Sequence, residues 1–166
     1  MHLPKEKTFP GLMDEMAERF GDRNFVTDHK RKLSYKEFRV EVHQLAKALS
    51  AIGVRKDTKV ALLMGNQIEW LVIDFAVTLL GGVLVAVNTW WKRIELEHAL
   101  YSTDASILIM VDRYIGNNYS QALREIENRE IAFPCLKKIV GFGDDLLPGA
   151  MSYQELLTLS EGVSDS

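Results

Sequence analysis

GVRKDTKVALLMGNQIEWLVIDFAVTLLGGVLVAVNTWWKRIELE, residues 53–97, is the stretch that decides the fold. Residues 59–64, KVALLM, carry apolar side chains at consecutive positions, which is typical of a parallel strand covered on both faces. The apolar run that follows ends at Gly81 and Gly82, which a turn accommodates more easily than a helix does. Residues 83–87 then resume as a second strand rich in β-branched side chains. This order of elements predicts a βαβ unit and therefore a parallel sheet.

A helix is predicted between these two strands, with its N-cap at Asn66. The Asn66 side chain can accept a hydrogen bond from the first-turn amides, and Glu69, three residues later, can reach back to the cap.

The run from Trp70 to Val87 is apolar enough to be weighed as a membrane span. However, Asp74 would cost about 2.5–3.5 kcal/mol near a bilayer centre. The glycine pair also divides the run into pieces of helix and strand length, so we expect no transmembrane segment.

The alternation of helices and strands continues on both sides of this block. Residues 60–64, 83–87 and 107–111 are expected to be parallel neighbours in one sheet, with helices packed on its faces. We therefore predict an α/β fold, with one domain over residues 1–160 and a tail over residues 161–166. The other predicted elements are a helix over 10–20 ended by Gly21, strands over 24–28 and 32–33, a helix over 34–52 with a Ser34–Glu37 capping box, a helix over 92–102, a strand over 106–111, a helix from about Asn118 to Asn128, a strand over 137–140, and a helix capped by Ser152 and Glu155.

Composition and charge narrow the class of protein. With 166 residues and a formal net charge of −3, the chain is long enough for one core and has no excess of positive charge to attract nucleic acid. The basic cluster His29–Lys32 is interpreted as a solvated hairpin turn. The single cysteine, Cys135, excludes an internal disulfide, suits a reducing compartment and is expected to be buried and inert. The N-terminal residues lack the apolar segment of a secretory signal. A cytoplasmic location is therefore expected.

A series of short motifs and predicted elements occurs in a fixed order, without gaps, along residues 53–97. The order is a Gly-Val turn, a strand, an Asn with a Glu soon after, a helix, a Gly-Gly pair, a strand, an Asn and a Glu-Leu pair. They stand at Gly53–Val54, Val60–Met64, Asn66 and Glu69, Gly81–Gly82, Asn88 and Glu95–Leu96. This pattern resembles the N-terminal region of the AMP-dependent (adenylate-forming) acyl-CoA synthetase family. The segments TFPGLMDEMAERFGDR, LSYKEF and VDRYIGNNYSQALREI extend the resemblance to nearly the whole chain. One departure is Thr89, where the family often has Pro.

The resemblance implies an N-terminal portion of an acid–CoA ligase. Such a parent forms an acyl-adenylate from ATP and a carboxylic acid, fatty or alicyclic, and transfers the acyl group to CoA, so that ATP, Mg and CoA are implied for the full-length protein. The family's Ser/Thr/Gly-rich loop ending in Lys, its Tyr-Gly-x-Thr-Glu motif and its late catalytic Lys do not occur in this sequence. We therefore interpret the chain as an N-terminal fragment or truncated product that binds none of these cofactors and is inactive alone.

Trp90 and Trp91 are the strongest candidates for a functional site, as part of a substrate pocket or an interface. Large aromatic side chains line ligand pockets and protein interfaces, although packing across the sheet edge would also explain them. Asp144–Asp145 is interpreted as a solvated turn rather than a pair of catalytic carboxylates. The four histidines, His2, His29, His43 and His98, show no spacing that suits a metal, and none is predicted to be bound.

Two other classes of function are compatible with the pattern. The first is a non-catalytic interaction or scaffold module that keeps the family fold without an active site. The second is an unrelated doubly wound domain, which should carry acidic or phosphate-binding residues at the ends of its strands. The residues after KVALLM are Gly65 and Asn66, which disfavours the second class. The expected partners are the remainder of the synthetase or a second copy, bound through exposed apolar surface.

Overall fold

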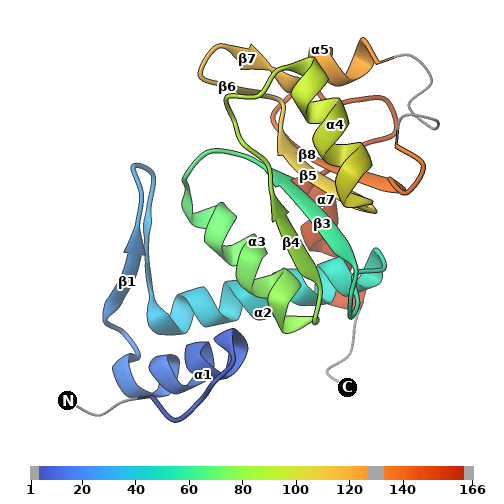
Figure 1. Cartoon of the computed structure of the whole chain (residues 1–166). Coiled ribbons are helices and arrows are strands. Elements are labelled where there is room, and N and C mark those ends of the chain that lie inside the picture. Colours follow the sequence, from blue (N-terminus) through green and yellow to red (C-terminus); the bar gives the residue numbers. More distant parts are fainter. Residues whose placement is uncertain (1–3, 127–132, 163–166) are drawn as a thin grey trace.

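A computed structural model describes residues 4–126 and 133–162 (Figure 1). Its centre is a five-stranded parallel sheet with the strand order β4-β3-β5-β8-β9. Val60 of β3 lies opposite Leu84 of β4 and Ile107 of β5, so the predicted parallel neighbours are confirmed. The strands are β3 Lys59–Leu63, β4 Val83–Ala86, β5 Ile107–Val111, β8 Lys138–Phe142 and β9 Met151–Ser152.

Helices cover both faces of this sheet, as the sequence predicts (Figure 1). Successive side chains of a strand point to opposite faces, so Val60 and Leu62 belong to one core cluster while Ala61 and Leu63 belong to the other. The first cluster contains residues of α2 Tyr35–Ala51, α3 Ile68–Leu79 and α7 Tyr153–Thr158; the second contains residues of α4 Arg93–Thr103 and α5 Tyr119–Arg124.

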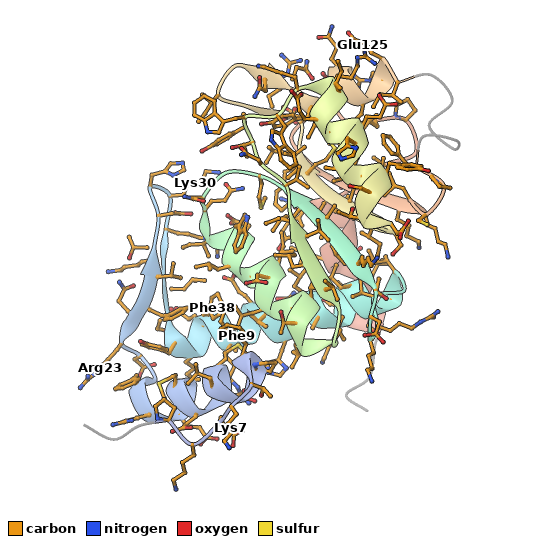
Figure 2. The ribbon with its side chains drawn as sticks, in the orientation of Figure 1. Lys7, Phe9, Arg23, Lys30, Phe38 and Glu125 are labelled. Carbon is orange, nitrogen blue, oxygen red and sulfur yellow. The ribbon has the colours of Figure 1, made fainter. Side chains whose placement is uncertain are left out.

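The N-terminal segment adds a further layer outside α2 and α3. Helix α1, Phe9–Phe20, is followed by an antiparallel hairpin of β1 Asn24–Thr27 and β2 Lys32–Ser34. The ring of Phe75 in α3 lies 5.8 Å from that of Phe9 and 5.2 Å from that of Phe38, both in edge-to-face arrangements. Figure 2 shows Phe9 near α1 and Phe38 on α2. These aromatic contacts join the N-terminal layer to the core.

Local capping signals are confirmed where acceptor and donor lie close together in sequence. Ser34 with Glu37 and Ser152 with Glu155 both form complete capping boxes, and hydrogen bonds from the serine amide and hydroxyl lower the pKa of each glutamate. Gly21, with φ of 45°, ends α1 as expected. The left-handed region favours glycine at this position.

The predicted N-cap of α3 is wrong. The helix begins at Ile68, after Gln67, and the Asn66 side chain does not cap it. Instead, the Asp28 carboxylate at the end of β1 accepts a hydrogen bond from the Ile68 amide at 3.1 Å. Amides of Arg31, Ile68 and Lys30 hold the pKa of Asp28 at about 2, and this charged acceptor complements the positive end of the helix. Its partner is forty positions away, so local spacing did not reveal it.

The basic cluster His29–Lys32 forms the predicted hairpin turn, but one of its members is not a free surface charge. His29 and Lys30 are exposed, and Figure 2 shows Lys30 at the hairpin tip. The Arg31 guanidinium is half-buried and lies 2.5 Å from a Glu41 oxygen and 2.9 Å from a Glu69 oxygen. Glu69, expected to support the cap of α3, therefore pairs with the hairpin.

The remaining boundaries differ from the predictions by a few residues. Helix α5 ends at Arg124, whereas the prediction continued it to Asn128, which lies outside the described residues. Residues 161–162, expected in the tail, belong to a 3₁₀ turn, Leu159–Gly162, and residues 163–166 lie outside the described part. Across residues 4–126 and 133–162, every helix falls short of the length and apolar character needed to cross a membrane.

Candidate functional site

The connections that follow β3, β4, β5 and β8 meet at the carboxyl edge of the sheet. In open parallel sheets, ligands bind in the crevice outside this edge. The segment after β4 contains Trp90 and Trp91, and the segment after β5 forms a second small hairpin of β6 Arg113–Tyr114 and β7 Asn117–Asn118. This edge is therefore the place in the described chain with the features expected of a site.

Trp90 and Trp91 are exposed at the surface of this edge. The exposed fractions are 71% for Trp90 and 37% for Trp91, and Ile94, in the first turn of α4, is 70% exposed. Trp90 lies in the turn that precedes α4, three residues before Arg93, the first residue of this helix. Large apolar side chains gathered at an exposed position are characteristic of an interaction surface. The functional role of Trp90 and Trp91 stays a prediction.

The backbone under the two tryptophans is held by hydrogen bonds. The Trp90 amide donates to the Asn88 side-chain oxygen at 2.9 Å, and the Trp91 amide donates to the Asn88 carbonyl at 3.2 Å. The Lys92 amide donates to a Glu95 carboxylate oxygen at 3.0 Å, which closes the start of α4. The exposed rings therefore stand on an ordered turn, which lowers the entropic cost of using them in binding.

A second set of contacts ties this turn to the neighbouring hairpin. The Thr89 carbonyl accepts hydrogen bonds from the Asn117 side-chain amide at 2.9 Å and from the Tyr119 hydroxyl at 2.5 Å. Tyr119 is fully buried, and burial raises the pKa of its hydroxyl, which therefore stays protonated as a donor. Lys92 donates to the Asn117 side-chain oxygen. A groove of about 300 Å³ runs between α4 and the hairpin, with Trp91 on its wall.

The hairpin after β5 packs closely on the end of β3. The Tyr114 ring lies so near Gly65 that an added Cβ there would be 2.2 Å from the ring, which explains glycine at this position. Its turn consists of Ile115 with φ of 42° and Gly116 with φ of 77°. A β-branched residue in the left-handed region is an outlier that costs free energy, and Ile115 is also 64% exposed. Its neighbour Gly116 lines the groove of Trp91.

Asp144 and Asp145 do not form a pair of catalytic carboxylates. Asp144 is exposed, as expected for a solvated turn. Asp145 is half-buried and lies 2.6 Å from an Arg124 nitrogen and 3.0 Å from an Arg113 nitrogen. Arg124 and Arg113 hold the pKa of Asp145 at about 2, so it remains an ion-pair partner rather than a proton donor. The sequence did not reveal these distant arginine contacts.

Other candidate side chains remain apart. In the described residues, 4–126 and 133–162, no three His, Cys, Asp or Glu side chains come close enough together to hold a metal ion. Cys135 is half-buried rather than buried, with its sulfur 3.8 Å from an Asp104 oxygen. His43 of α2 lies 3.7 Å from an Asp14 oxygen of α1.

Comparison with known proteins places these features in a family. The profile of the family described as AMP-binding enzyme matches residues 13–155. The putative acyl-CoA synthetase YngI of Bacillus subtilis is 29% identical over 171 aligned positions, which cover 96% of this chain and 31% of YngI. The mitochondrial medium-chain acyl-CoA ligase ACSF2 of Bos taurus is 27% identical, over 99% of this chain and 25% of ACSF2. The chain thus spans less than a third of the length of these relatives.

Solved structures show the same fold. The anthranilate CoA ligase AuaEII in complex with anthranoyl-AMP matches with a TM-score of 0.77 and 24% identity, over 94% of this chain and 29% of that one. The N-terminal domain of FACL13 from Mycobacterium tuberculosis matches with a TM-score of 0.76 and 16% identity, over 96% of this chain and 36% of that one. At this identity the structures establish the fold alone, while the profile match over residues 13–155 shows that the chain belongs to the AMP-binding enzyme family.

Proposed function

We propose that this chain forms the N-terminal portion of an acid–CoA ligase. Such an enzyme activates a carboxylic acid with ATP to an acyl-adenylate and transfers the acyl group to CoA. The observation that carries the proposal is the family match over residues 13–155, together with relatives named as acyl-CoA synthetases or ligases that align with almost the whole chain. The exposed, ordered surface around Trp90 and Trp91 agrees with this assignment.

Within that enzyme, this chain would supply structure and surface rather than reacting groups. Its sequence has no Ser/Thr/Gly-rich loop ending in Lys to hold ATP phosphates, and no Tyr-Gly-x-Thr-Glu motif. The ATP, Mg and CoA sites implied for the family would therefore be completed by other parts of the protein. We expect the 166-residue chain alone to form no acyl-adenylate.

The test of this function has two arms. In the first, the chain alone is mixed with ATP, Mg, CoA and a panel of fatty, aryl and alicyclic acids, and pyrophosphate release is measured. In the second, the chain replaces the aligned segment of YngI, and the same acids are assayed with the chimera. We expect no release from the chain alone and acid-dependent release from the chimera. Pyrophosphate release by the chain alone would contradict the proposal that other parts of the enzyme supply the reacting groups. A folded but inactive chimera would favour the non-catalytic scaffold module.

We further propose that Trp90 and Trp91 cover an interface with the remainder of the enzyme, or with a second copy when the remainder is absent. Adjacent exposed tryptophans on a hydrogen-bonded turn are typical of interface anchors. Ile94 at the start of α4 and Ile115 in the hairpin of β6 and β7 are also exposed, by 70% and 64%. Isolated exposed side chains of this size are common, but a group of them on one edge is not.

The proposed location is the cytoplasm. The single cysteine, Cys135, is free and half-buried, and its sulfur lies beside Asp104 rather than in a disulfide. A chain without disulfides suits a reducing compartment, in which ATP and CoA are also available to an enzyme of this kind.

A further inference from the structure

A second groove lies at the opposite edge of the sheet, where the strands begin. Its volume is about 380 Å³. It exists because β9 has only two residues and pairs only with Val140 and Gly141, which leaves the first residues of β8 without a neighbouring strand on that side. The segments around it precede strands: Ile52 follows α2, Lys137 leads into β8, and Ala150 leads into β9. The groove is therefore separate from the tryptophan surface at the carboxyl edge.

The floor of this groove is apolar and drawn from both cores. Ile52 belongs to the cluster on one face of the sheet, and Leu123 and Phe133 belong to the cluster on the other. Such a floor offers contact to a hydrocarbon chain without exposing polar groups of the protein core.

One backbone donor points into the same space. The Lys138 amide donates to the Ser106 carbonyl of the β5 side, and Phe142 accepts from the Asp112 amide, so alternate residues of β8 face β5. Ile139 lies between Lys138 and Phe142 in this alternating pattern of backbone hydrogen bonds. Its N–H therefore points away from β5 and toward the groove. The pairing of β9 begins opposite Val140, so it does not reach the Ile139 N–H. This N–H is available to an acceptor in the groove.

The rim is positively charged. Lys137 and Lys138 both line the groove and are exposed, and none of the described residues that line it carries a carboxylate. Within residues 4–126 and 133–162, neither ammonium lies within 4.0 Å of a carboxylate oxygen. Two cations and a backbone donor beside an apolar floor complement a molecule with an anionic head and a short apolar body.

We propose that this groove is a binding site for a short amphiphilic anion. Its head group would lie between Lys137, Lys138 and the Ile139 N–H, and its hydrocarbon chain would lie on the floor formed by Ile52 and Leu123. The volume is near the lower end of the range of about 300–1,000 Å³ usual for ligand pockets, so a chain of medium length suits it. This inference is independent of the proposed ligase function.

The test uses three probes that share one chain, octanoate, octyl phosphate and octanol, each below its aggregation concentration. Binding to the 166-residue chain is followed by amide chemical shifts. We expect the anions to move the amides of Ile139, Ala150 and Met151, and octanol to bind at least about fivefold more weakly, because it lacks the charge that the lysines attract. A preference for octanoate or for octyl phosphate identifies the head group as carboxylate or phosphate.

Charge-reversal variants locate the head group. Lys137→Glu combined with Lys138→Glu should weaken octanoate binding by about tenfold or more, because two attractions become repulsions. The matched control is Lys36→Glu on α2, an exposed lysine outside the groove, which should leave affinity within about twofold. Amide dispersion shows whether each variant folds, and the milder pair Lys137→Gln with Lys138→Gln should give an intermediate loss.

The proposal would be overturned by equal binding of octanol and octanoate. It would also be overturned by shifts centred on Trp90 and Trp91, or by affinity that survives the double charge reversal in a folded variant.

Discussion

Replacing Arg31 with Met tests whether the hairpin is held to the helical layer by charge. The guanidinium connects three segments that are distant in sequence: the hairpin itself, Glu41 of α2 and Glu69 of α3. It makes two hydrogen bonds to Glu41, at 2.5 and 3.0 Å, and one to Glu69, at 2.9 Å. These bonds, to Glu41 first and then to Glu69, raise the pKa of Arg31. Methionine keeps most of the aliphatic stem and removes only the charged head.

The expected cost follows from the degree of burial. The exposed fractions of the side chains are 35% for Arg31, 31% for Glu41 and 20% for Glu69. Breaking a fully buried pair costs about 3–5 kcal/mol, and an exposed pair contributes about 0–1 kcal/mol. The cluster lies between these limits, so we expect Arg31→Met to lower the free energy of unfolding by about 2 kcal/mol. At about 2–4 °C per kcal/mol for a chain of this size, the midpoint of thermal unfolding should fall by about 6 °C.

Glu69→Gln is the matched comparison because the cluster contains two carboxylates and one guanidinium. One Glu69 oxygen, Oε2, is buried without a hydrogen-bond partner in the described part of the chain. Neutralising Glu69 should therefore cost less than about 0.5 kcal/mol, since Arg31 keeps both bonds to Glu41. In the double variant, Glu69→Gln should recover about 1 kcal/mol of the Arg31→Met loss, because one of two uncompensated carboxylates is removed.

Urea unfolding followed by circular dichroism measures all four proteins of this double-mutant cycle at pH 7. Unchanged m-values would show that the variants differ in stability rather than in compactness. The reasoning is refuted if Arg31→Met costs less than about 0.5 kcal/mol, the value of an exposed pair. It is also refuted if the two changes are additive, since residues coupled in one ion-pair network should not be.

Three further predictions follow from the same structure. The pKa of Asp28 is lowered from 3.8 to about 2, so its contribution to stability is present above pH 3.8 and lost as the pH falls to about 2. Asp28→Asn should therefore reduce the change in urea midpoint between pH 3.8 and about 2. An unchanged acid dependence in this variant would exclude Asp28 as the cap of α3. Burial raises the pKa of Asp74 because it disfavours the charged carboxylate in the folded state. Asp74→Asn should therefore raise the urea midpoint at pH 7, and this gain should vanish below pH 3.8. A lower midpoint at pH 7 would show that the Asp74 carboxylate has an unrecognised partner. Sedimentation of the 166-residue chain should show dimers or larger species at micromolar concentration. Trp90→Ser with Trp91→Ser should weaken this association, whereas the control Tyr101→Ser, at a side chain of α4 that is 59% exposed, should not. A monomeric wild type would show that the tryptophan surface does not drive self-association.

The parts of the fold that could be predicted are those fixed by neighbours in sequence. The strands at the sheet centre could be recognised because each is buried on both faces and so is apolar at consecutive positions. The capping boxes at Ser34 and Ser152 could be recognised because donor and acceptor are three residues apart. Gly21 could be assigned to a helix end because its left-handed conformation favours glycine.

The parts that could not be predicted depend on long-range contacts. Asn66 has the right chemistry for an N-cap, but the hairpin brings Asp28 to the same helix end. A carboxylate, a stronger acceptor than an amide oxygen, satisfies the first amide of α3 there. Arg31 is one of four neighbouring basic residues that the sequence predicts to be solvated, because its partners Glu41 and Glu69 are ten and thirty-eight positions away. Sequence spacing carries no information about a partner that only the tertiary fold supplies.

The candidate site combines both kinds of information. The sequence identifies Trp90 and Trp91 as unusual, but it cannot separate a packed pair from an exposed one. The structure adds that the rings are exposed while the backbone beneath them is bound to Asn88 and, through Thr89, to the buried Tyr119. A floppy apolar loop would lose conformational entropy on binding, whereas this turn has already lost it on folding. Trp90, 71% exposed, gains little from packing within the chain, which is why we propose that a binding partner covers it.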